Sequence, residues 1–98
     1  MAAFRATVGD EVIARSDAVV RLEGNVYFPP DAVDRRYLTS SRTKSLCPWK
    51  GIASYYTVEA DGLVLPNAAW YYRHPSPLAR RIKDHVAFFP TVRVEECQ

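Results

Sequence analysis

The chain has 98 residues, 48% of them hydrophobic and 12% aromatic, a composition that predicts one small globular domain spanning residues 1–98. No apolar run approaches membrane-spanning length and the N-terminus lacks the apolar core of a secretory signal, so we expect a cytoplasmic protein with no membrane partner. Its two cysteines, Cys47 and Cys97, form no CxxC pair, which excludes a four-cysteine zinc site within one chain; we expect reduced thiols, no metal and no cofactor.

The formal net charge of +2 is unevenly distributed along the sequence. Residues 1–34 carry three arginines and six acids, whereas residues 35–58 carry no acid. The basic residues of that second stretch are Arg35, Arg36, Arg42, Lys44 and Lys50. Such a stretch attracts phosphates or nucleic acid, or it is a solvated face whose partner charges lie elsewhere in the fold. Five positive charges are few for a nucleic-acid-binding surface, so we treat nucleic-acid binding as the weaker hypothesis.

Short segments of alternating or continuous apolar residues recur along the chain, separated by glycine-containing turns. Gly9-Asp10 and Asp61-Gly62 are hairpin signals, and Gly24-Asn25 predicts another turn. The expected strands cover residues 4–8, 11–15, 18–23, 26–28, 52–59, 63–65, 68–72, 85–89 and 92–94.

Two short helices are expected, near residues 30–38 and 77–83. Proline at the first helical turn supports both, and Ser76 is suited to cap the second. Residues 39–42 are polar and predict a loop. The fold class is therefore mainly β: a small antiparallel barrel or tent-like sheet with two short helices.

The most distinctive stretch is residues 43–51, which ends in Cys47-Pro48-Trp49-Lys50-Gly51. Proline restricts its own backbone and that of the residue before it, and Gly51 permits a tight turn. A thiol, an indole and an ammonium are thus brought together beside a bend.

This motif and three other segments resemble one known family. The matching residues are Tyr27-Phe28-Pro29-Pro30, Thr43, Cys47-Pro48-Trp49-Lys50-Gly51, Ala53, Tyr55, Ala69-Trp70, Tyr72, Pro75 and Ala87-Phe88. The pattern resembles domain-of-unknown-function family 427, sometimes labelled nucleotidyltransferase-like. The resemblance covers nearly the whole chain and implies a small, mainly β fold without an established substrate. The residues themselves show no Gly-Ser pair followed by spaced aspartates, so they do not support metal-dependent nucleotidyl transfer.

The candidate binding residues cluster in or near the motif, and each has a structural alternative. Lys50 either binds an anion or lays its stem on Trp49 with the ammonium in water. Cys47 is either a reactive thiol or a buried structural cysteine. The large aromatic residues either line a pocket or fill the core. The full candidate set is Lys50, Trp49, Cys47, Tyr55, Trp70, Tyr72, Arg42 and Lys44.

We therefore expect a domain that binds a small anionic or nucleotide-like ligand in an aromatic and basic pocket around the motif, with any catalysis left open. The alternatives are a non-catalytic module that docks an acidic protein and a weak nucleic-acid binder. A ligand site predicts that Lys50, Trp49 and Trp70 converge on a cavity, whereas an interaction module predicts a flat apolar patch.

Overall fold

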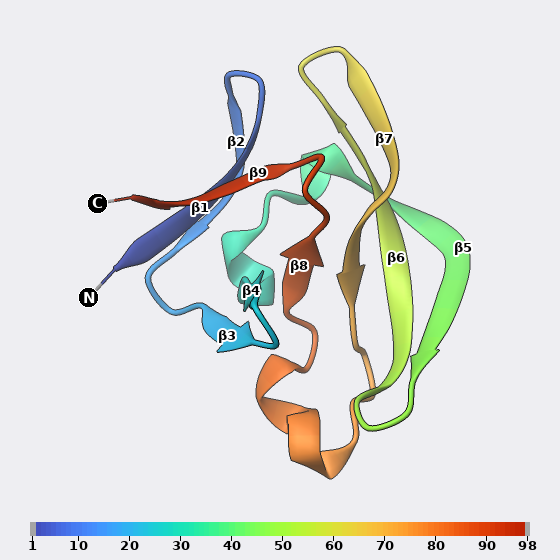
Figure 1. The fold of residues 1–98 in the computed structure, drawn as a ribbon. Helices are drawn as coiled ribbons and strands as arrows, with labels where there is room; N and C mark the ends of the chain where they lie inside the picture. Colours follow the sequence, from blue (N-terminus) through green and yellow to red (C-terminus); the bar gives the residue numbers. More distant parts are fainter. Residues whose placement is uncertain (1, 98) are drawn as a thin grey trace.

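The fold, seen in a computed structural model that describes residues 2–97, is built almost entirely from antiparallel strands (Figure 1). The described strands are β1 (Ala3–Val8), β2 (Glu11–Ser16), β3 (Val20–Leu22), β4 (Asn25–Tyr27), β5 (Leu38–Cys47), β6 (Gly51–Ala60), β7 (Leu63–Tyr71), β8 (Val86–Phe88) and β9 (Arg93–Cys97). The described helices are short 3-10 turns: η1 (Pro30–Ala32), η2 (Arg35–Tyr37) and η3 (Pro77–Ile82). None of these helices is long and apolar enough to cross a membrane.

The strands form three sheets with the orders β2-β1-β9, β3-β4 and β5-β6-β7-β8. The mainly β prediction is confirmed, but the described strands do not close into a barrel. Separate short bridges join the sheets instead. Phe28 and Val86 exchange backbone hydrogen bonds of 2.8 and 2.9 Å, and the Asp34 amide donates to the Ile13 carbonyl at 2.8 Å. Because the first and last strands pair, the two ends of the chain lie side by side (Figure 1).

The predicted loop at residues 39–42 is wrong, because this segment belongs to the ten-residue strand β5. Its polar composition suits an edge strand, since β6 is its only neighbour in the described sheet. The register shifts between Ser40 and Lys44, an irregularity that weakens the strand signal further. Similarly, the two strands expected at 63–65 and 68–72 are one strand, β7, and Pro66 falls where its pairing with β6 is interrupted.

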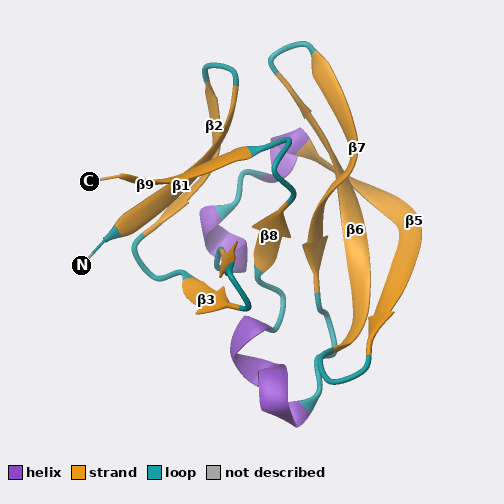
Figure 2. Ribbon diagram, viewed as in Figure 1, coloured by secondary structure: helices purple, strands orange, loops and turns teal. Residues whose placement is uncertain are grey.

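The helices lie where they were expected but are tighter and shorter than α-helices. The region 30–38 holds two separate turns, η1 and η2, and the second is capped by the Asp34 side chain. The region 77–83 holds η3. Figure 2 shows that all of the helical segments lie in the connections between strands.

Alternate residues of the four-stranded sheet enter two different cores, so this sheet is buried on both faces in its central part. The first core lies between this sheet and the β2-β1-β9 sheet and consists of Ala6, Val8, Ile13, Ala14, Phe28, Val33, Val58, Ala60, Ala68, Ala69, Val86, Phe88 and Val92. The second core consists of Tyr27, Ala53, Tyr72, Ala79, Ile82 and Ala87. Helix η3 closes the second core through Ala79 and Ile82. This second core carries the candidate site.

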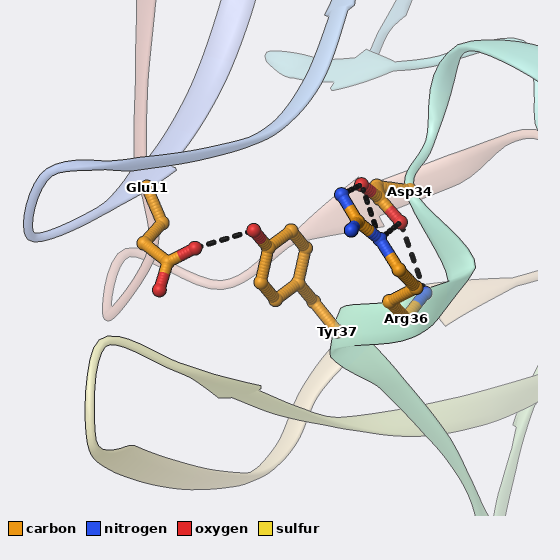
Figure 3. Close-up of polar contacts among 4 residues, drawn as sticks. All are labelled: Glu11, Asp34, Arg36 and Tyr37. Atoms are coloured by element: carbon orange, nitrogen blue, oxygen red, sulfur yellow. Dashed lines mark hydrogen bonds and ion pairs between the residues drawn. The ribbon is translucent and has the colours of Figure 1, made fainter.

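A polar contact fixes the opposite end of the molecule, where the β1–β2 and β6–β7 turns meet. Tyr37 donates a hydrogen bond to the Glu11 carboxylate (Figure 3). The same carboxylate also accepts from the Asp61 amide at 3.3 Å. The bond to Glu11 raises the pKa of Tyr37. A Cβ at Gly9 would force the Asp61 carboxylate to move, and the φ of +58° at this position favours glycine.

Candidate functional site

Lys50 is a buried lysine at the end of the turn between β5 and β6. Only 6% of the residue is exposed, and its ammonium donates to the Glu23 carboxylate in an ion pair. The ammonium also lies 5.6 Å from the centre of the Trp49 ring and 5.4 Å from that of Tyr72. Trp49 donates its indole N–H to the same carboxylate at 3.1 Å. A buried cation is thus held by one carboxylate and two aromatic faces, as a desolvated charge requires.

Burial and pairing act on the pKa of Lys50 in opposite directions. Burial on its own would lower this pKa, but the hydrogen bond to Glu23 and the electron-rich oxygens of Tyr27 and Tyr72 outweigh it and raise the pKa. The hydrogen bond from Lys50, followed by that from Trp49, lowers the pKa of Glu23. Both partners are therefore charged at neutral pH.

Glu23 reaches Lys50 from an unfavourable backbone position. It forms the β3–β4 turn together with Gly24, and their φ angles are +54° and +80°. Such a two-residue hairpin turn favours asparagine, aspartate or glycine at its first position, and a longer side chain there costs about 1 kcal/mol. The contacts with Lys50 and Trp49 offset this cost, so tertiary structure rather than local preference places Glu23.

The motif turn is anchored from the other side by the start of η3. The Ser76 amide donates to the Lys50 carbonyl at 2.8 Å, and its hydroxyl donates to the Trp49 carbonyl at 2.5 Å. Gly51 has a φ of +116°, and a Cβ at this position would lie 3.3 Å from the His74 carbonyl oxygen. Glycine is therefore needed at the end of the motif for both its conformation and its small size.

A pocket of about 690 Å³ begins at the β3–β4 turn, where Gly24, the residue after Glu23, is part of its lining. We call it the Trp70 pocket, and it is lined by Gly24, Asn25, Val26, Trp70, Phe88, Phe89, Pro90, Val92, Arg93 and Val94. The ring centres of Trp70 and Phe89 are 4.7 Å apart, and Tyr55 stacks on Phe89 at 6.3 Å. Trp70 also donates its indole N–H to the buried Tyr27 hydroxyl at 3.2 Å. Trp70 therefore connects the pocket to the second core, which also carries Tyr72 beside Lys50, while Phe88 and Val92 of the first core form another part of the pocket wall.

The structure distributes the predicted site residues over three places. Lys50, Trp49 and Tyr72 form the ion-pair cluster, and the half-buried Cys47 packs against the same core. Trp70 lines the pocket, and Tyr55 stacks on Phe89, which also lines it. Lys44 donates instead to Ser54 at 2.8 Å, and Arg42 is exposed on β5. The sequence therefore grouped eight residues that do not converge on one cavity.

Several residues of this region were not among the predicted site residues. Glu23 and Arg93 come from turns and strand ends with no local signal of a site, and Phe89 was counted only as part of an apolar strand. Tyr27 lay within a segment of the family resemblance, which was the single hint available for it. All four are distant from the motif in sequence, so only folding could reveal that they adjoin it.

The fold and the site together define a small antiparallel β domain with a buried lysine–glutamate pair beside an aromatic pocket. A family model matches residues 2–98, and the chain belongs to that family, the domain of unknown function DUF427, also labelled NTP_transf_9. The resemblance seen in the motif is thereby confirmed. A comparison with curated proteins gave no match. Within residues 2–97, no three histidine, cysteine, aspartate or glutamate side chains are grouped so that they could hold a metal ion.

Proposed function

We propose that this domain binds a small ligand that combines a planar ring with an acidic group, as nucleotide-like compounds do, and that the ring enters the Trp70 pocket. The observation that carries the proposal is the pocket itself, because about 690 Å³ is a typical volume for a small-molecule site. Its walls are mainly apolar and aromatic, with a few polar groups at the edge.

The two aromatic residues at the pocket favour a planar group. Phe89 is 40% exposed although it is a large apolar side chain, and it leans against Trp70. An exposed aromatic beside a half-buried indole offers a stacking surface for a ring. Tyr55 stacks on one face of Phe89 and so limits its movement.

The preference for an acidic group follows from the charges at the pocket edge. Arg93 lines the pocket, and its Nε lies 3.3 Å from Glu95. The same carboxylate is also paired with Arg5 at 2.9 Å. One negative charge is thus shared by two arginines, which leaves a net positive charge beside the pocket and favours an anion there.

The test is a thermal-shift screen with nucleotides, aromatic acids and sugar phosphates, followed by calorimetric titration of any compound that raises the melting temperature. Phe89→Ala should lower affinity about tenfold, the usual effect of losing one stacking partner. Leu63→Ala is the matched control, because it shortens another exposed apolar side chain that does not line the pocket. No stabilising compound, or equal affinities for the Phe89→Ala and Leu63→Ala proteins, would contradict the proposal.

Lys50 contributes to this function by holding the β3–β4 turn against the pocket, since its ammonium is already paired with Glu23. Lys50→Met and Glu23→Gln each break that pair, so both changes should lower ligand affinity. A ligand anion bound directly to Lys50 would instead have to displace Glu23. In that case Glu23→Gln would raise affinity while Lys50→Met lowered it, and titration of both proteins separates the two roles.

A further inference from the structure

The two ends of the molecule carry opposite charges. Strand β6 connects them, with the motif turn at its start and the turn at residues 61–62 at its end (Figure 1). Acidic side chains gather around the second of these turns, namely Asp10, Glu11, Glu59 and Asp61. The segment 73–83 lies at the other end, beside the motif turn, and contains no acid. Its basic residues are Arg73, Arg80, Arg81 and Lys83.

These four basic side chains are exposed and have no carboxylate partner among residues 2–97. The ion pairs within the described part of the chain involve Arg5, Arg36, Lys50 and Arg93, all of which lie outside this segment. The positive charge that the sequence assigned to residues 35–58 is, by contrast, partly neutralised, because Arg36 pairs with Asp34 and Lys50 with Glu23. Segment 73–83 therefore carries four exposed cations and no acid, and no described carboxylate pairs with any of them.

Large apolar side chains are exposed at the same end. Leu78 in η3 is 81% exposed, and the exposed Arg80 and Arg81 follow it in the same short segment. Trp49 is 36% exposed on the adjacent motif turn, which Ser76 ties to η3. The cross-strand pair Leu46 and Ile52 is also exposed beside this turn. An exposed leucine among unpaired cations favours a partner that is both anionic and apolar.

We propose that this end of the domain docks on an anionic lipid bilayer, with Leu78 entering the interface and the four cations contacting lipid head groups. A bilayer offers negative charge and an apolar layer within a few ångströms, whereas a nucleic-acid backbone would gain nothing from Leu78. The acidic end then faces away from the surface, as repulsion requires. The expectation of no membrane partner rested on the absence of a spanning segment, which does not bear on attachment from the surface.

The experiment is flotation of the purified protein with vesicles of phosphatidylcholine alone or mixed with phosphatidylglycerol. Wild type should bind only the anionic vesicles and be released by high salt. Each cation near such a surface contributes about fivefold, so Arg80→Gln/Arg81→Gln should reduce the partition coefficient about 25-fold. Leu78→Ser should reduce it as well. Arg21→Gln/Arg42→Gln, which removes the same charge elsewhere, should have a much smaller effect.

Three results would overturn the proposal. The first is failure of wild type to bind phosphatidylglycerol vesicles, whether or not it binds a single-stranded oligonucleotide at the same salt concentration. The second is an equal loss of vesicle binding for the two double variants, which would indicate attraction by net charge alone. The third is unchanged binding of Leu78→Ser. All of the substituted side chains are exposed, so a melting curve is a sufficient control for folding.

Discussion

The two cores of this domain share strands β6 and β8 but differ in chemistry. The first core joins two sheets and consists of alanine, valine, isoleucine and phenylalanine, with no side-chain polar atom. The second core is smaller, contains two tyrosines, and adjoins Trp70 and the charged Lys50. Burial of apolar area without polar groups gives the greater stability. From this difference we infer that the first core supplies most of the stability of the fold, while the second positions hydrogen-bonding groups beside a pocket.

Consecutive residues allow the two cores to be compared directly, since Tyr27 and Phe28 are both fully buried and point into different cores. The largest effect is expected for Phe28→Ala, which should lower the free energy of unfolding by about 3–5 kcal/mol because it leaves a cavity in the first core. Urea denaturation measures this loss. A cost below about 1 kcal/mol would mean that the first core does not carry the stability.

Tyr27→Phe should have an intermediate effect, about 1 kcal/mol, because it removes only the hydroxyl that accepts from the Trp70 indole. The ring itself stays packed, so the second core keeps its shape. Ligand affinity in the Trp70 pocket should change more than stability does, since Trp70 loses its orienting partner. An equal loss of unfolding free energy for Tyr27→Phe and Phe28→Ala would contradict the proposed division between the cores.

The smallest effect on stability is expected when the pH is lowered. The pKa of Glu23 is lower in the folded protein than its ordinary value of 4.5, so the pair with Lys50 contributes stability above that pH and loses it as the pH falls through the lower folded value. Glu23→Gln lacks this contribution at every pH. The melting temperatures of wild type and Glu23→Gln should therefore differ at neutral pH and converge in acid. A difference that stays constant down to the acid limb would show that the carboxylate charge is not what stabilises the turn.

The elements predicted from sequence are those with strong local signals. Asp61-Gly62 does form a hairpin turn, with φ angles of +53° and +75° that favour such residues. The alternation of β6 also holds, with Ala53 and Tyr55 on the side of the second core and Val58 in the first. Strand β5 was missed because its residues are polar, and its strand geometry comes from pairing with β6 rather than from its own preference.

The candidate site was predicted only in part, for a similar reason. Burial of Lys50 beside Trp49 and Tyr72 agrees with the grouping of these residues around the motif. Its partner could not be foreseen, because Glu23 lies 27 positions away in a turn that glutamate does not favour. Lys44 and Arg42 were included because of their charge alone. Lys44 is paired with Ser54 across β5 and β6, and its ammonium donates to the Ser54 hydroxyl rather than joining Lys50.

By itself, the sequence determined the mainly antiparallel β architecture, the positions of most turns and the family, because these depend on local periodicity, glycine placement and a contiguous motif. Only the tertiary structure decided which charges are neutralised and which remain free. Glu23 is brought to Lys50, Glu95 to Arg5, and none of the described carboxylates to the arginines of η3. Electrostatic pairing depends on distances of a few ångströms between residues far apart in the chain, and the sequence does not specify such distances until the strands have packed.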